Sequence, residues 1–325
     1  MNNPDENWEK ISWNLAGEID SRFIIYAPVD EVARRPITCY RMYDQRDPSS
    51  PSYMIITTNE NEFEVGESMI HRHIMVLKKA KGRSRHIPEL VISGTVPSLC
   101  YVQKGGVQEE PFPDITNRSI CIFSHFAHPL GELKAFTEKG FFPTLVALAI
   151  GQGMVRALAA LHNLGFVHRE VSPYTLGYKT PISFNRLQHD LMVIDFGSVL
   201  PFPSEPRRYA TFVGTLRYSS PNSHHDKELG PADDIISVIY VVAELIYGKL
   251  PWRSIYMKEA IKEAKEKFTR SICFFHLPRE IRALYLEMLG TLNTSTLNYP
   301  SILNTIQKAM IRYSYQSTNL PIFMK

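Results

Sequence analysis

The sequence predicts an α+β fold of two lobes, with a small β-rich lobe first and a larger α-helical lobe after it. The first third of the chain contains short β-branched and aromatic runs separated by Pro, Asp and Ser, a pattern typical of strands and turns. From Gly131 onward the apolar residues recur at helical spacing instead. We therefore expect an N-terminal tail over residues 1–12, an N-lobe over residues 13–123, a C-lobe over residues 124–313 and a C-terminal tail over residues 314–325.

The N-lobe is expected to contain one helix and several short strands. The helix is predicted over Glu67–Ala80, where Met69, Ile70, Ile74 and Leu77 share one face. The strands are predicted at Ser21–Tyr26, Ile37–Tyr43, Tyr53–Thr58, Val91–Val102 and Ile120–Phe123.

The C-lobe is predicted to be built on two apolar helices, Pro143–Leu164 and Asp233–Tyr247. Gly165 follows the first helix and suits the left-handed backbone of a C-cap. Short strands are expected between the two helices, near Tyr174–Tyr178 and Leu191–Ile194, and a long loop after them.

Composition and charge argue against several classes of function. The chain has 325 residues and a formal net charge of +3 with no clustered basic stripe, so no nucleic-acid partner is expected. Its four cysteines form no Cys-x-x-Cys pair and its first residues are polar, which predicts a cytoplasmic or nuclear protein. The most apolar stretches, Leu145–Leu161 and Ile235–Tyr247, each contain a charge and are shorter than a clean membrane span, so no membrane partner is expected.

Three motifs follow one another in the second half of the chain. His168-Arg169-Glu170 comes after the first apolar helix, and Asp195-Phe196-Gly197 ends a buried strand. Gly214–Tyr218 then precedes the acidic pair Asp233-Asp234 and the tripeptide Leu250–Trp252. Each motif alone is weak, but their order and spacing resemble the catalytic loop, magnesium-binding Asp-Phe-Gly, activation segment and central helix of protein kinases.

The particular forms of these motifs narrow the resemblance to the casein kinase 1 superfamily, and within it to the tau-tubulin-kinase-like branch. Gly-Thr-x-Arg-Tyr, the acidic pair and Leu-Pro-Trp carry it, and it covers about Trp13 to Tyr313. The resemblance implies a two-lobed protein kinase-like fold. It also implies phosphoryl transfer from ATP, which depends on positioning and on neutralising charge.

The N-lobe lacks the groups with which this family binds phosphates. The stretch that resembles the glycine-rich loop is Gly17–Tyr26, yet no glycine occurs between Glu18 and Val65. The family's strand lysine falls at Ile56 or Thr57, and the sequence has no lysine from Ile11 to Leu77. The N-lobe therefore offers a phosphate group neither the backbone N–H groups of a glycine-rich loop nor the ammonium group of a lysine.

Other N-lobe positions also depart from the family pattern. The resemblance places His73 where the family has a glutamate that pairs with the lysine, and Phe123 at the gatekeeper position. Ile56, Phe123 and Asp195 thus outline a degenerate ATP site.

The catalytic loop is altered at three positions. The general base of the family becomes Glu170, one methylene longer, and a misplacement of ~1 Å can cost ~10²-fold in rate. Ser172 replaces the lysine that steadies the transferred phosphate, and Thr175 replaces a metal-binding asparagine. Glu170 could instead pair with a nearby arginine.

Several retained residues have a structural interpretation. His168, Phe196 and Gly197 are expected to support the packed centre of the fold, and Asp234 to accept hydrogen bonds from the catalytic-loop backbone. Asp195 is the candidate Mg²⁺ ligand, although Mg²⁺ usually needs substrate phosphates as further ligands.

The sequence therefore predicts a pseudokinase that serves as a protein-interaction or scaffold module. We expect no firmly bound cofactor, at most weak binding of ATP and Mg²⁺. Protein partners are expected, with acidic or phosphorylated segments binding at Arg217 and the nearby Arg207 and Arg208.

Two alternatives remain open. The first is an atypical active serine/threonine kinase with Glu170 as base, Asp195 as metal ligand, and Arg22 or Arg41 as the missing cation. The second is a nucleotide-binding regulator without catalysis.

Overall fold

The computed structural model describes residues 17–19, 22–28, 37–47, 52–57, 60–95, 101–102, 117–124, 128–137, 140–179, 183–205, 207 and 210–314. The chain forms two compact units: Met1–Arg83 with Pro88–Phe126, and Ser84–Ile87 with Ala127–Lys325. The first contains an antiparallel sheet and the second is mostly helical, so the predicted α+β class is confirmed.

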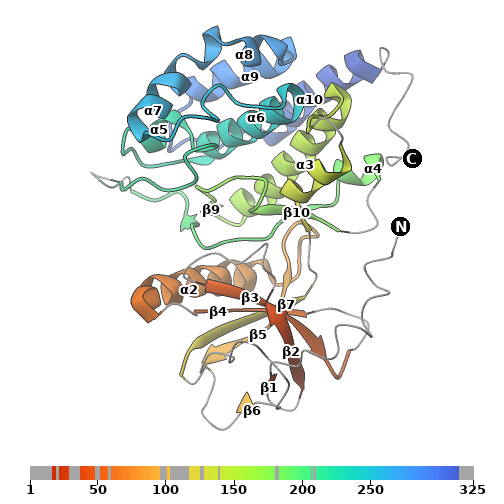
Figure 1. The fold of residues 1–325 in the computed structure, drawn as a ribbon, viewed down its shortest axis with the longest axis vertical. Coiled ribbons are helices and arrows are strands. Elements are labelled where there is room, and N and C mark those ends of the chain that lie inside the picture. The colour runs from red at the N-terminus through yellow and green to blue at the C-terminus, as the bar shows by residue number, and fades with distance from the viewer. Residues whose placement is uncertain are drawn as a thin grey trace. The chain divides into compact units, whose positions relative to one another are not determined.

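The first unit is built on an antiparallel sheet with the strand order β5-β7-β4-β3-β2-β1-β6 in the described part of the chain (Figure 1). Strand β4 is buried at every position, because it lies between two neighbouring strands and under a helix. Phe23, Met42, Met54 and Ile122 belong to the core of this sheet. The strands are β1 Gly17–Ile19, β2 Phe23–Pro28, β3 Ile37–Asp44, β4 Ser52–Thr57, β5 Glu89–Thr95, β6 Tyr101–Val102 and β7 Ser119–Ser124.

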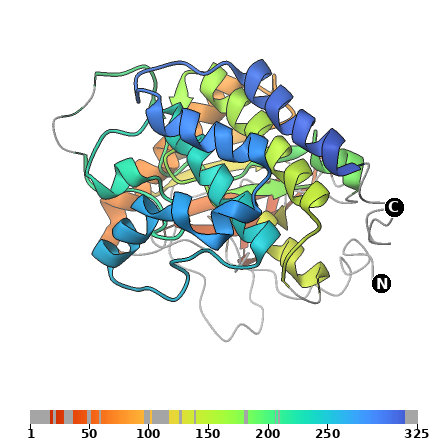
Figure 2. The ribbon, with the colours of Figure 1, turned by 90° about the horizontal axis from the view of Figure 1, so that it is seen from above.

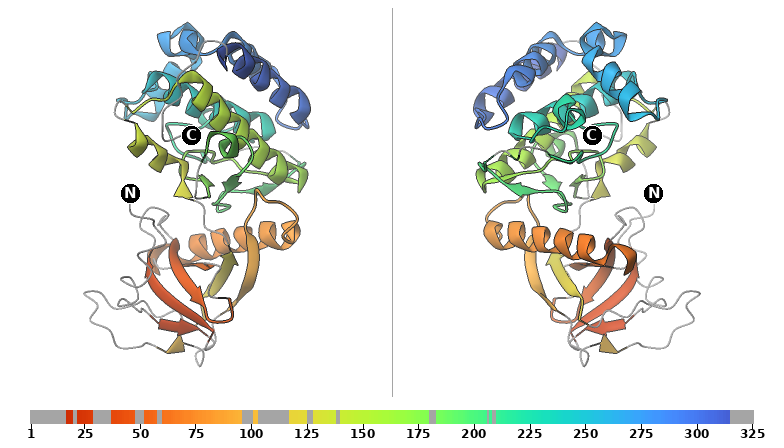
Figure 3. Two further views of the ribbon diagram at one scale, coloured as in Figure 1. Left: turned by 90° about the vertical axis from the view of Figure 1, so that its right-hand side faces the viewer. Right: turned by 90° about the vertical axis from the view of Figure 1, so that its left-hand side faces the viewer.

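Helix α2 (Phe63–Ala80) packs against this sheet, after the short 3-10 turn η2 (Glu60–Glu62) (Figure 3). Its buried side chains include Ile70, Val76 and Leu77. The helix starts four residues before the predicted range and ends at Ala80. Its C-cap, Lys81, has a left-handed backbone, and the Lys81 N–H donates to the Leu77 carbonyl.

The single strand predicted at Val91–Val102 is wrong. Strand β5 ends at Thr95 and pairs with β7, whereas β6 pairs with β1 at the other end of the sheet order. Pro97 lies between them in the sequence, and a proline has no N–H to give to a sheet ladder.

The second unit has a core of three long helices: α3 (Thr144–Asn163), α6 (Pro231–Tyr247) and α10 (Tyr299–Ser314). Helix α3 packs on both α6 and α10 (Figure 2). The other helical elements are η3 Leu130–Phe136, α4 Phe184–Leu187, α5 Pro221–His224, α7 Lys258–Glu266, η4 Phe268–Arg270, α8 Ile272–His276 and α9 Arg279–Gly290. Short strands complete the unit: β8 His128–Pro129, β9 Phe166–Val167, β10 Leu176–Tyr178, β11 Leu191–Val193 and β12 Leu200–Pro201.

Helix α3 corrects one expectation, because by length and composition it could cross a membrane. However, 78% of its apolar stretch is buried inside the unit, where it packs on α6 and α10. That burial is typical of the core helix of a globular domain.

Two glycines in helices allow a direct test of this packing. A Cβ at Gly153 in α3 would overlap the carbonyl oxygen of Leu187, whereas nothing lies within 4 Å of a Cβ at Gly290 in α9. We predict that Gly153→Ala destabilises the chain, because neither the backbone of α3 nor the backbone at Leu187 can move freely to make room for the added methyl group. Gly290→Ala should leave stability unchanged or raise it by up to ~1 kcal/mol, since alanine favours helix. Urea unfolding of both variants checks this, and equal effects would contradict the packing.

Candidate functional site

The three motifs meet in the second unit on loops that short strands fix at both ends. Residues 168–175 connect β9 to β10, and Asp195-Phe196-Gly197 lies between β11 and β12. Strand β9 pairs with β12, and β10 pairs with β11. The two loops are therefore neighbours, although they are separate in the sequence.

Asp234, at the start of α6, fixes the beginning of the first loop. Its carboxylate accepts hydrogen bonds from the backbone N–H groups of His168 and Arg169, both at 2.8 Å. The Nε2 atom of His162 in α3 lies 2.8 Å from the same carboxylate. Arg169 has a φ of 69°, a costly backbone conformation for a residue other than glycine, and the bond from its own N–H supports it.

Ser172 and Thr175 bond to each other and to the loop backbone. Both residues are 0% exposed. The Thr175 hydroxyl accepts from the Ser172 N–H at 2.9 Å and lies 2.9 Å from the Glu170 carbonyl, to which it donates. The Ser172 hydroxyl accepts from the Tyr174 N–H at 3.2 Å. These hydroxyls therefore close the loop on itself instead of pointing at a ligand.

Glu170 is held by a residue that the sequence interpretation missed. Its carboxylate accepts a hydrogen bond of 2.6 Å from the Ser198 hydroxyl. The side chain of Arg169 donates to the Ser198 carbonyl at 2.7 Å, so Arg169 and Glu170 contact the same residue. Ser198 directly follows Asp195-Phe196-Gly197, and this position next to a recognised motif is the sequence feature that could have identified it.

Asp195 is nearly buried, and one of its carboxylate oxygens accepts from the Gly197 N–H at 2.8 Å. Among the described residues no group of three or more His, Cys, Asp and Glu side chains gathers as for a metal. The hydroxyl of Thr175, the other position expected to bind metal, is bonded to the loop backbone. Of the two positions expected to bind Mg²⁺, Asp195 keeps a carboxylate whereas the Thr175 hydroxyl is used within the loop, so the residues present supply only part of the site that the family implies.

In the first unit, the two candidate lysine positions have no ligand-binding character. Ile56 belongs to the apolar core of the sheet. The Thr57 hydroxyl donates to the Glu67 carboxylate at 2.9 Å, and the Thr57 carbonyl accepts from Arg118 at 2.5 Å. A hydroxyl–carboxylate hydrogen bond thus links β4 to α2 where the family has an ion pair.

This contact corrects the placement of the helix partner at His73. The Nδ1 atom of His73 lies 2.9 Å from the Met69 carbonyl of its own helix, whereas Glu67 reaches β4. The reason is the close approach at Gly66, where a Cβ would lie 2.6 Å from a methyl carbon of Thr57. Phe123 is buried in β7 and stacks on Tyr53 with ring centroids 6.1 Å apart.

The topology also moves the position expected for the glycine-rich loop. Strand β4 leads into α2, so the two strands before it are β2 and β3, and residues 29–36 connect them. These residues lie outside the described ranges. The expected match, Gly17–Tyr26, falls on the turn between β1 and β2 instead. Residues 29–36 likewise contain no glycine and no lysine, although they include Arg34 and Arg35.

The arginines expected to bind an anion have carboxylate partners. Two of the three guanidinium nitrogens of Arg207, Nε and Nη2, donate to Glu228, at 2.7 and 2.9 Å. Arg217 lies 4.0 Å from the buried Glu244. Arg208 lies outside the described residues. The described arginines thus pair with two different carboxylates and do not converge on one point.

The alternating lysines and glutamates of residues 258–267 are typical of a solvated helix face, but Lys265 departs from that pattern. This lysine is 1% exposed. It lies four residues after the buried Ile261, so the two occupy one face of α7. The four-residue spacing from Ile261 is the sequence feature that could have indicated that Lys265 is buried.

Lys265 binds the third motif and the residues that directly follow it. Its ammonium donates to the carbonyls of Leu216 and Ser219, at 2.8 and 2.5 Å, and lies 3.1 Å from Nε2 of His224. Burial lowers the pKa of Lys265. Burial, together with the positive charge of Lys265, also lowers the pKa of His224 to about 3. Buried polar contacts therefore fix this segment.

An antiparallel sheet with a packed helix, a helical unit and a loop bonded to the start of its central helix define a kinase-type domain. The protein kinase domain model matches residues 102–298, more than half of the chain. The chain belongs to the protein kinase family.

Relatives add detail to this assignment. The chain is 35% identical over 171 residues to a "probable serine/threonine-protein kinase" of Dictyostelium discoideum, covering 50% of this chain and 34% of that protein. It is 28% identical over 211 residues to an "inactive tau-tubulin kinase" of Caenorhabditis elegans, covering 61% of this chain and 66% of that protein. A "probable casein kinase I homolog" of Encephalitozoon cuniculi is 28% identical over 165 residues, covering 46% and 52%. The chain therefore spans between about a third and two thirds of these relatives' lengths.

The bonds of Thr175 give a prediction about stability. Thr175→Val should lower the free energy of unfolding by about 1–3 kcal/mol, because it leaves the Ser172 N–H and the Glu170 carbonyl buried without this partner. Thr294→Val, at an exposed position, is the matched control. Urea unfolding with Mg²⁺ and with EDTA measures both. A loss that occurs only with Mg²⁺ would mean that Thr175 binds metal instead.

The pKa of His224 predicts acid sensitivity. Between about 3 and the ordinary 6.5, the unfolded chain binds a proton at His224 that the folded chain does not. Stability should therefore fall as the pH drops through this window, and His224→Gln should lose less than the wild type. Thermal unfolding at pH 7 and pH 5 tests this, with exposed His189→Gln as control. Identical pH dependence of wild type and His224→Gln would contradict it.

Proposed function

We propose that this chain is a pseudokinase of the casein kinase 1 type, which acts as a protein-interaction or scaffold module with little or no phosphoryl transfer. The observation that carries the proposal is the closed pair Ser172 and Thr175. Both are fully buried and hydrogen-bonded within the loop, at the positions where the family has a phosphate-binding lysine and a metal-binding asparagine.

The size of the expected defect supports this proposal. Phosphoryl transfer depends on cations near the developing charge, and each lost group typically costs ~2–3 kcal/mol of transition-state stabilisation. Several such losses approach ~10 kcal/mol, or about seven orders of magnitude in rate, although they do not add strictly.

The alternative of an atypical active serine/threonine kinase rests on two retained carboxylates, Glu170 and Asp195. Glu170 is oriented by Ser198 and is not fully buried, so it keeps the minimum requirement for a base. The alternative needs a phosphate-binding cation, and Arg22 already bonds Asp44 at 2.6–3.2 Å. The second alternative is a regulator that binds ATP, as an active kinase does, but like a pseudokinase transfers no phosphate.

One experiment separates these functions. We expect Mg-ATP to raise the melting temperature of the purified chain by less than ~1 °C, since a ligand that does not bind cannot stabilise. We expect no labelled phosphate on casein or on the chain itself. Stabilisation without transfer would favour the nucleotide-binding regulator. Transfer that Asp195→Ala abolishes would overturn the proposal in favour of the active kinase, and a casein kinase 1 preparation serves as the positive control.

A further inference from the structure

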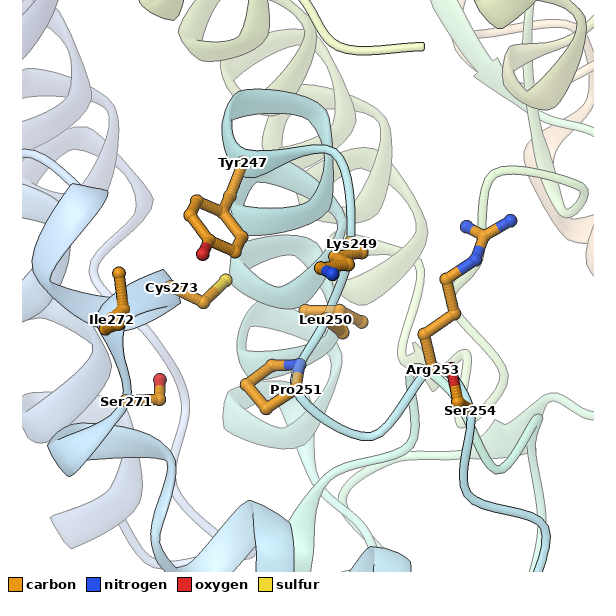
Figure 4. Close-up of a pocket in the computed structure, with 9 residues that line it drawn as sticks. All are labelled: Tyr247, Lys249, Leu250, Pro251, Arg253, Ser254, Ser271, Ile272 and Cys273. Carbon is orange, nitrogen blue, oxygen red and sulfur yellow. The ribbon is translucent and has the colours of Figure 1, made fainter.

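A small pocket lies in the second unit, away from the catalytic loop in the sequence. Two segments line it: residues 247–254, at the end of α6 and just after it, and residues 271–273, at the start of α8 (Figure 4). Its volume is about 250 Å³. This is below the ~300–1,000 Å³ typical of sites for drug-sized ligands, so it suits one or two side chains of a peptide.

The pocket and its surroundings are positively charged. Lys249 and Arg253 line it, and no lining residue is acidic. The sequence has no acidic residue between Glu244 and Glu259 or between Glu266 and Glu280, the two stretches that supply the lining. Lys249 is exposed and makes no ion pair within the described residues.

The nearest carboxylate is already occupied. Glu244 is buried and lies 3.0 Å from Arg253 and 3.2 Å from Lys134. It also accepts a 2.5 Å hydrogen bond from the Tyr218 hydroxyl. Because Arg217 also lies 4.0 Å from it, one carboxylate faces three cations, and it holds Arg253 in place beside the pocket.

Apolar side chains accompany this positive charge. Leu250 and Cys273 are buried in the lining, and burial raises the pKa of the Cys273 thiol to about 12, so it remains neutral. Ile272 lines the pocket and is 64% exposed, and Phe275, one turn further along α8, is 61% exposed. Large exposed apolar side chains beside a pocket are a usual sign of a binding surface.

We propose that this pocket, with Lys249 and Ile272 at its edge, docks a peptide segment of a partner protein in which an apolar side chain is flanked by aspartate or glutamate. The apolar side chain enters the pocket, and the flanking carboxylates pair with Lys249 and Arg253. Rim charges of this kind guide association, while the inserted side chain supplies most of the affinity. The inference rests on the proposed interaction role and names one surface for it.

The chain's own C-terminal residues 315–325 do not have this chemistry, because they contain no acidic residue. Residues 1–12 contain Asp5, Glu6, Trp8 and Glu9, and so provide an intramolecular competitor that the experiment has to distinguish.

The test uses the full chain and three fluorescein-labelled peptides, none with a hydroxyl side chain. The first has Leu-Phe flanked on each side by two glutamates, the second replaces the glutamates by lysines, and the third replaces Leu-Phe by Gln-Gln. Fluorescence anisotropy at physiological salt should show saturable binding of the first peptide only. Lys249→Glu and Ile272→Ser should each weaken it ~10-fold or more, about 1.4 kcal/mol.

Matched variants control for charge and for exposed apolar surface. Lys308→Glu on α10 makes the same charge change, and Leu292→Ser removes another exposed apolar side chain. Both should leave the dissociation constant within about twofold, because substitutions at distant, independent sites do not alter a local binding site. Circular dichroism confirms that all four variants fold.

Three results would overturn the proposal. They are the absence of saturable binding, equal binding of the lysine peptide, and equal weakening by Lys308→Glu. Tighter binding after removal of residues 1–12, or self-association in sedimentation that Lys249→Glu abolishes, would assign the pocket to the chain itself and likewise overturn it. Failure of peptide binding contradicts this surface alone, whereas phosphate transfer to casein contradicts the proposed function alone.

Discussion

The hydrogen bonds of Asp234 are the constraint on which the candidate site depends. One buried carboxylate at the start of α6 accepts two backbone N–H groups of the catalytic loop and contacts His162 of α3. Hydrogen bonds to a charged group contribute about 1.5–3 kcal/mol each, and an unpaired buried carboxylate would cost more than that. The loop therefore adopts its kinase-like path whether or not it performs chemistry. This separation of scaffold from chemistry allows catalytic residues to change while the fold remains.

The replaced catalytic residues have taken on structural bonds of their own. Thr175 and Ser172 exchange a metal ligand and a phosphate cation for hydrogen bonds that close the loop. In the first unit, Thr57 and Glu67 exchange an ion pair for a hydroxyl–carboxylate bond. In both places a long or charged side chain has become a short one that satisfies its neighbours. Under the proposed function, such side chains stabilise the fold without supplying the positive charge that a phosphate group requires.

Buried charged side chains in the second unit likewise fix the segment after Gly214 through hydrogen bonds. Lys265 donates to carbonyls of this segment, and Glu244 accepts from the Tyr218 hydroxyl. Because a buried charge without partners is costly, these contacts favour one arrangement of the segment. A segment fixed from within by such contacts is suited to present a constant surface to other proteins. Glu244 also positions Arg253, so the same carboxylate connects this segment to the pocket after α6.

The sequence alone determined the class of fold, the order of the motifs and the absence of the phosphate-binding lysine and glycines. These conclusions hold because apolar periodicity is local, and because a residue type missing from a whole stretch is missing in any register. Partners distant in sequence could not be predicted, since hydrogen-bond geometry depends on how separate elements pack. Glu67 rather than His73 reaches β4 because Gly66 allows a close approach, and Ser198 from the neighbouring loop donates to Glu170. Only the tertiary structure decided that Ser172 and Thr175 bond to each other, because burial and direction, not residue type, determine whether a hydroxyl faces a ligand or its own backbone.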